Sequence, residues 1–114
     1  MKHFVKVMKA LSEPNRLKIL KILQRKACCV YEIKETLGMA QPTVSKHLRI
    51  LKTAGLVSAE KHGLWVEYHI SDGRCSPYAA TLMGNLRHWL NEDSEIQETM
   101  EKMQNVDFIH IMKR

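Results

Sequence analysis

In residues 41–55 the apolar side chains recur with the period of an α-helix, and this pattern limits the folds open to the chain. Val44, Leu48 and Leu51 recur at i, i+4 and i+7 and form one apolar stripe. At about 100° per residue, the opposite face carries hydroxyls and cations without a carboxylate, namely Thr43, Ser45, Lys46, Arg49 and Thr53. Gly55 can turn left-handed just past the helix end. The segment therefore predicts a helix with one buried face and one face suited to phosphates and base edges.

A shorter helix precedes this segment. Val30, Ile33 and Leu37 recur at i, i+3 and i+7, and the pattern stops at Gly38. Three residues (38–40) then join the two helices. This arrangement predicts a helix-turn-helix over about 30–54, in which the second helix enters the DNA major groove. The alternative is two helices of an ordinary bundle.

The periodicity changes from 3.6 to 2 after residue 56, which indicates β-strands. Residues 57–62 alternate, and residues 64–70 alternate again, with a turn signal at His62 and Gly63. The pattern predicts a two-stranded hairpin over about 57–70. A hairpin directly after a recognition helix is the wing of a winged helix, with Lys61 and His62 at its tip.

Helices are also predicted on both sides of this unit. An amphipathic helix precedes Ser12, and residues 14–24 form a second helix that is apolar around most of its circumference. The second helix is expected to be central, with Lys18, Lys21 and Arg25 on a narrow solvent-facing stripe.

The C-terminal third returns to helical spacing. Ser94, followed three residues later by Gln97, is a capping-box signature for the start of a last helix. The apolar stripes are Tyr78, Leu82, Leu86, Trp89 and Leu90, then Ile96, Met100 and Met103. These stripes predict dimerisation helices over about 77–104, which would give two recognition helices for a two-fold site. Packing within one chain is the alternative.

Length and composition fit one domain over residues 1–114. No apolar run is long enough to span a membrane and no signal peptide is evident, so we expect a cytoplasmic protein. Residues 1–62 hold thirteen basic and four acidic residues, a net charge of +9, whereas the remainder carries −3. A basic half that contains the helix pair fits a nucleic-acid footprint, although a lysine-rich solvated surface gives the same count.

An enzyme is not indicated. The sequence has no glycine-rich phosphate loop, no nucleophile elbow and no paired carboxylates on one apolar face. A winged helix used only for protein contact would be expected to have an apolar or acidic recognition helix, but here that helix is basic.

The runs ALSEPNRLKILKIL and QPTVSKHLRILKTAGLV, followed by GLWVEYHI, resemble the arsenic-repressor (ArsR/SmtB-type) family over about residues 4–90. The resemblance implies a homodimeric, mostly α winged helix-turn-helix protein with a β-hairpin. Such a protein represses transcription from a double-stranded DNA operator and releases it when an inducer binds. It needs no resident cofactor. Carried onto matching positions, the DNA contacts are Gln41, Thr43, Ser45, Lys46, His47 and Arg49, with Lys61 and His62 on the wing.

The thiols indicate an inducer site. Arsenic-sensing members of that family carry Cys-Val-Cys at the start of the first helix of the helix-turn-helix; here Cys29 matches and Tyr31 does not. Cys28 is an adjacent thiol, and Cys75 could complete a trigonal set for As(III) or Sb(III), since thiolates select soft ions. Another soft metal ion, reversible oxidation, persulfide formation, or cysteines that serve only as small apolar residues are the alternatives.

Overall fold

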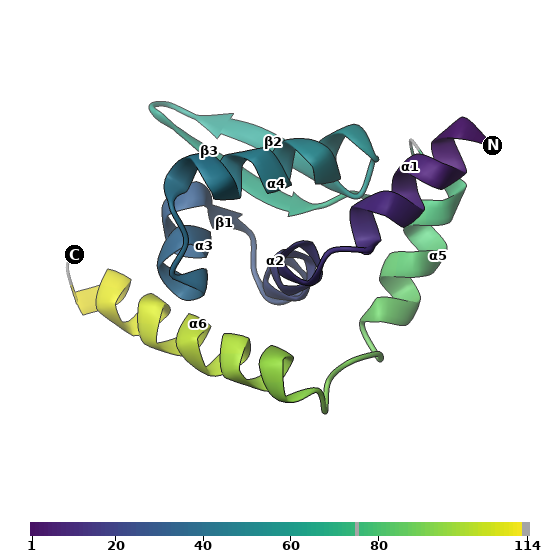
Figure 1. Cartoon of the computed structure of the whole chain (residues 1–114). Helices are drawn as coiled ribbons and strands as arrows, with labels where there is room; N and C mark the ends of the chain where they lie inside the picture. Colours follow the sequence, from purple (N-terminus) through teal and green to yellow (C-terminus); the bar gives the residue numbers. More distant parts are fainter. Residues whose placement is uncertain (75, 113–114) are drawn as a thin grey trace.

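The computed structural model describes residues 1–74 and 76–112, with side chains up to Val106. Six helices and three strands follow one another in this part of the chain (Figure 1). In order they are α1 (Lys2–Leu11), α2 (Pro14–Arg25), β1 (Cys28–Cys29), α3 (Val30–Leu37), α4 (Gln41–Thr53), β2 (Val57–His62), β3 (Trp65–Ile70), α5 (Pro77–Leu86) and α6 (Ser94–Met112).

The predicted helix-turn-helix is confirmed in α3 and α4. Gly38 ends α3 with a left-handed φ of 65°, a conformation that costs glycine little because it has no side chain. The stripe of Val44, Leu48 and Leu51 is fully buried. Burial of these three side chains fixes which face of α4 points to solvent.

The hairpin is confirmed, but the sheet has a third strand that the sequence did not predict. β2 and β3 pair antiparallel from Val57↔Ile70 to His62↔Trp65, so the turn is Gly63–Leu64, one residue later than expected. β1 pairs with the other edge of β3, with Cys28 opposite Tyr68. Two residues are too few to show a periodicity of 2, which explains why β1 was missed. We call β2, β3 and their turn the wing. Since β1 directly precedes α3, its pairing with β3 connects the start of α3 to the wing.

α2 is central, as predicted, but the prediction that Lys21 faces solvent was wrong. Lys21 is 7% exposed. Its ammonium group donates to the carbonyl oxygens of Leu86 and Trp89, both at 2.8 Å, and to Oδ1 of Asn91 at 2.6 Å. These carbonyls lie at the end of α5 and just beyond it, so Lys21 satisfies groups that the helix leaves without partners. Burial lowers the pKa of Lys21.

The C-terminal helices differ in detail from the prediction. α5 ends at Leu86, so Trp89 and Leu90 lie beyond it and are 51% and 42% exposed. Ser94 is the first residue of α6 rather than its cap. The Asp93 carboxylate accepts hydrogen bonds from the backbone N–H groups of Glu95 and Ile96, because a carboxylate is the stronger acceptor at a helix start.

The apolar stripe of α6 is covered in part within the chain. Ile96 and Met103 are buried, and α6 packs along α2 and α3, below them in Figure 1. Part of this stripe is thus covered within the chain, whereas α1 and α5, which lie side by side, keep exposed apolar side chains. In the part of the chain that the structure describes, no helix is long and apolar enough to cross a membrane.

Candidate nucleic-acid interface and thiol site

The outer face of α4 presents most of the residues predicted to contact DNA. Gln41, Thr43, Lys46 and Arg49 are exposed, and Ser45 is partly buried at the edge of this face. We call Gln41, Thr43, Ser45, Lys46 and Arg49 the α4 outer face. Amide, hydroxyl, ammonium and guanidinium groups are the side chains that bind base edges and phosphates. Pro42 lies in the first turn of α4, where a backbone N–H would have no partner within the helix, so the N–H that proline lacks is not missed.

His47 lies on a different side of α4. Its Nδ1 is 3.3 Å from a guanidinium nitrogen of Arg16 and 4.0 Å from a carboxylate oxygen of Glu13, both on the α2 side. Burial lowers the pKa of His47, and Arg16 and Lys46 add to this effect against the opposing charge of Glu13. The ring is therefore neutral at pH 7 and joins α4 to α2.

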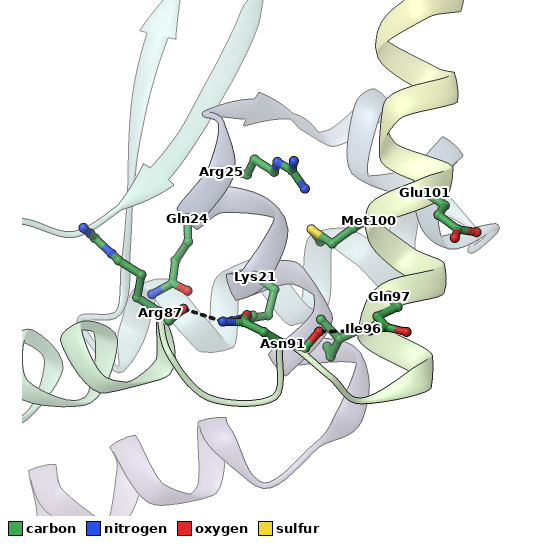
Figure 2. Close-up of a pocket in the computed structure, with 9 residues that line it drawn as sticks. All are labelled: Lys21, Gln24, Arg25, Arg87, Asn91, Ile96, Gln97, Met100 and Glu101. Atoms are coloured by element: carbon green, nitrogen blue, oxygen red, sulfur yellow. Dashed lines mark hydrogen bonds between the residues drawn. The ribbon is translucent and has the colours of Figure 1, made fainter.

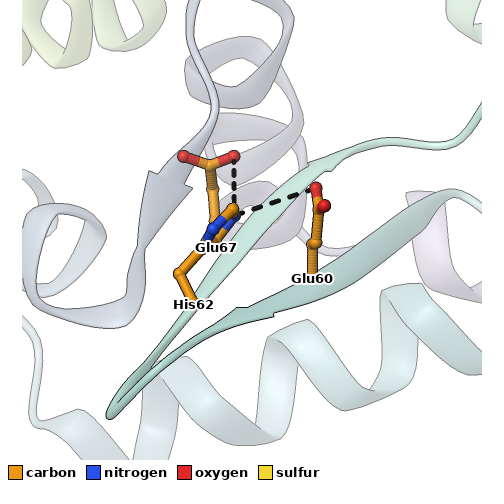
Figure 3. Close-up of side chains that lie close together, drawn as sticks. All are labelled: Glu60, His62 and Glu67. Carbon is orange, nitrogen blue, oxygen red and sulfur yellow. Dashed lines mark ion pairs between the residues drawn. The ribbon is translucent and has the colours of Figure 1, made fainter.

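The wing carries Lys61, which is exposed, and His62, which lies between two carboxylates (Figure 3). His62 Nε2 is 3.8 Å from Glu60 and 3.7 Å from Glu67, which are cross-strand partners, and its ring stacks on Trp65 at 5.1 Å. Two negative side chains thus flank His62, a predicted DNA contact. The sequence-based prediction did not include these two carboxylates.

Among the side chains that the structure describes, Glu60, His62 and Glu67 form the one group of three metal-binding residue types within reach of a single ion. Their donors are nitrogen and oxygen, which suit harder ions than As(III). The group therefore does not stand in for the predicted thiolate site.

Cys28 and Cys29 occupy β1, where successive side chains point to opposite faces. Cys28 is 2% exposed and its Sγ donates to the carbonyl oxygen of Lys26 at 3.3 Å, whereas Cys29 is half-buried. The two adjacent thiols therefore differ in their exposure to solvent. Cys75, the third predicted ligand, lies outside the described residues.

Cys29 also begins α3. Its sulfur accepts from the backbone N–H of Glu32, and the Glu32 carboxylate accepts from the backbone N–H of Cys29 at 3.1 Å. Burial raises the pKa of the Cys29 thiol, and the charge of Glu32 raises it further, so the thiol is protonated at neutral pH. Burial disfavours the Glu32 carboxylate, but its hydrogen bonds to Cys29 and Lys26 hold its pKa below the ordinary value.

Two hollows were not predicted from the sequence. A cavity of about 530 Å³ lies beside α6 and includes Lys21, Gln24 and Arg87 (Figure 2). In it, Gln24 donates to the Met83 carbonyl at 2.7 Å, and its buried Oε1 has no hydrogen-bond partner among the described residues. A groove of about 820 Å³ lies between α1 and α4, with Lys2, Lys6 and Lys9 on the α1 wall. The i, i+4, i+7 spacing of these lysines places them on one face of a helix, which could have indicated this groove from the sequence. The sequence-based prediction used them only in the net charge of residues 1–62.

Comparison with known proteins shows which family the chain is similar to. Residues 13–59 match the model of the bacterial regulatory proteins of the arsR family. An uncharacterized HTH-type transcriptional regulator of Methanocaldococcus jannaschii is 48% identical over 69 residues, which cover 60% of this chain and 78% of the relative. The chain belongs to the ArsR family.

Two further relatives of this ArsR-family chain extend the comparison. The arsenical resistance operon repressor of Escherichia coli K12 is 28% identical over 100 residues, which cover 87% of this chain and 83% of that protein. A homodimeric winged helix-turn-helix DNA-binding domain from Mycobacterium bovis, described as a possible ArsR-family regulator, superposes with a TM-score of 0.67 at 31% identity over 80% of this chain and 81% of that one. Some matched relatives are longer, and the chain spans 49% of one of them. The ArsR family consists of DNA-binding transcriptional regulators, which are not enzymes.

Proposed function

We propose that this ArsR-family chain is a homodimeric repressor that binds a double-stranded DNA operator through the α4 outer face and the wing. The observation that carries the proposal is the burial of Val44, Leu48 and Leu51 at 0% exposure beneath an exposed face of cations and hydroxyls. A helix held in this way can insert its outer face into a major groove without rearranging.

The chemistry of each side chain suggests its role. Gln41 can bind adenine or a phosphate, the hydroxyls of Thr43 and Ser45 can donate or accept, and Lys46 and Arg49 supply charge to phosphates. His47 is better suited to positioning α4, because its ring is engaged with Arg16. Lys61 adds charge at the wing.

Exposed apolar side chains on α1 and α5 support a dimer. Phe4 is 42% exposed and meets Tyr78 edge-on, with ring centroids 5.3 Å apart. An apolar hollow of about 310 Å³ nearby includes Leu82, Trp89 and Leu90. A surface of this kind fits a second copy of the chain, because apolar patches with aromatic residues are typical of interface cores. The homodimeric state of the M. bovis domain supports the same assignment.

For the inducer, we propose a soft ion such as As(III) or Sb(III) held by Cys28, Cys29 and Cys75. Arsenite can react with protonated thiols, since each S–H and As–OH yield an S–As bond and water. Because successive side chains of a strand point to opposite faces, we expect Cys28 and Cys29 to leave the strand geometry of β1 when they bind one ion. Loss of the Cys28↔Tyr68 pairing would separate the start of α3 from β3, so binding would move the helix-turn-helix relative to the wing.

The thiol test is an anaerobic ultraviolet titration of the reduced protein with arsenite, beside the double variant Cys28→Ser, Cys29→Ser. Serine is a good helix cap, so the variant is expected to keep α3. Sulfur-to-arsenic absorption that saturates near one ion per chain in the wild type alone would support the proposal. Equal absorption in both proteins, or none in either, would contradict it and direct the search to other soft ions, then to oxidants and persulfides.

A further inference from the structure

The groove between α1 and α4 has cationic side chains on both walls. Lys2, Lys6 and Lys9 line it from α1, and Lys46 and Arg49 line it from α4. All five are exposed, and the lining also includes two apolar residues, Val5, which is exposed, and Ile50, which is partly buried. The described residues that line the groove include no carboxylate. Cations that face one another without a counter-charge repel, so this arrangement favours an anionic occupant.

The spacing of the α1 lysines fits a polyanion better than a single small anion. Lys2 to Lys9 spans about 10 Å along a helix that rises 1.5 Å per residue. One DNA strand advances about 3.4 Å per phosphate, so a row of this length spans about three phosphate intervals of one strand. The apolar side chains of Val5 and Ile50 in the lining can accept the carbon surface of deoxyribose.

The groove is also continuous with the proposed DNA surface. Lys46 and Arg49 belong both to the α4 outer face and to the groove wall, so a strand held by α4 leads directly between the two helices. Arg16 holds this geometry, because its guanidinium donates to the carbonyl oxygens of Ala10 at 2.8 Å and Lys9 at 3.1 Å.

We propose that α1 is part of the DNA interface: Lys2, Lys6 and Lys9 bind the sugar-phosphate backbone of the duplex whose major groove receives α4. This inference rests on the proposed function and adds a second, sequence-independent contact to it. It assigns α1 two surfaces, an apolar one toward α5 and a cationic one toward DNA.

The experiment compares the full-length wild type with the triple variant Lys2→Ala, Lys6→Ala, Lys9→Ala on a labelled duplex selected from a random pool by the wild type. Affinity is measured at several salt concentrations, because the salt slope falls by about 0.9 for every phosphate that the protein no longer neutralises. The control triple variant Lys18→Ala, Arg87→Ala, Lys102→Ala removes the same charge from the α6 side, where Lys18 pairs with Glu95 and Lys102 with Glu98.

We expect the α1 variant to bind at least about tenfold more weakly at 0.1 M salt, with a slope smaller by about two or more, and the control to stay near the wild type. Phosphate ethylation interference should disappear at a contiguous set of phosphates in the α1 variant alone. An unchanged slope, an equal loss of affinity in the control, or a shift in oligomeric state without a slope change would overturn the inference. If the wild type itself binds no duplex, the proposed function fails instead.

Discussion

His47 makes the stability of the recognition helix sensitive to pH. Its ring contacts Arg16 and is largely buried, and its pKa in the folded chain lies below the ordinary value. Unfolded His47 titrates near 6.5, so below that pH the unfolded state binds more protons than the folded state. The free energy of unfolding therefore falls as pH is lowered through 6.5, and the contribution of His47 is complete only above it.

This effect can be measured by urea unfolding between pH 5 and 7.5. The variant His47→Gln should show a flatter dependence of the unfolding free energy on pH than the wild type. His88→Gln, at an exposed position after α5, serves as the control and should keep the wild-type dependence. Identical slopes in the wild type and His47→Gln would show that the ring does not couple folding to protons.

At the scale of the elements, the helices and the hairpin could be predicted from the periodicity of the sequence. The features that depend on tertiary contacts, the pairing of β1 and the burial of Lys21, could not. The stripe of α4 and the glycine after α3 were readable because local spacing and a left-handed turn determine them. The pairing of β1 with β3 was not readable, since only two residues take part. Lys21 was assigned to solvent because a charged residue on a helix is usually exposed, and its partners lie 65 or more residues away.

The buried ammonium of Lys21 gives the strongest test at this scale. Lys21→Met removes the donor to two backbone carbonyls at and beyond the end of α5, and buried acceptors without partners cost about 1–3 kcal/mol each. We expect the unfolding free energy to fall by about 2–4 kcal/mol. Lys18→Met, which removes only a partly exposed ion pair with Glu95, should change it by less than about 1 kcal/mol. Equal losses of stability in both variants, measured by chemical unfolding, would contradict this role.

At the scale of the whole molecule, α6 packs against α2 and α3. The apolar sides of α1 and α5 are proposed to face a second copy, and α4, the wing and the cationic side of α1 are proposed to face DNA. Leu90 supports the proposed contact with a second copy. It adopts a left-handed φ of 64° although it is not glycine, and it stays 42% exposed. A strained residue that keeps an apolar side chain in solvent is explained if the partner covers it.

Leu90→Gly therefore has opposite effects on the monomer and the dimer. It should relieve backbone strain, leaving the monomer as stable as the wild type or more so, and weaken dimerisation about tenfold or more because the leucine side chain no longer packs on the partner. Sedimentation equilibrium and chemical unfolding measure the two effects. Leu64→Gly at the wing tip, where the leucine is fully exposed, is the control and should leave dimerisation unchanged. Unaltered dimerisation in Leu90→Gly would place the interface elsewhere.

The most direct test of the central claim is the salt dependence of DNA binding by Lys46→Ala and Arg49→Ala on the selected duplex, with circular dichroism to verify the fold. Both side chains are exposed on α4, so we expect wild-type spectra, weaker binding, and a salt slope that falls by about one in each variant, because one phosphate is no longer neutralised. Lys102→Ala on α6 should bind as the wild type does. Unchanged affinity of both α4 variants at moderate salt would show that the α4 outer face is not the DNA-binding surface.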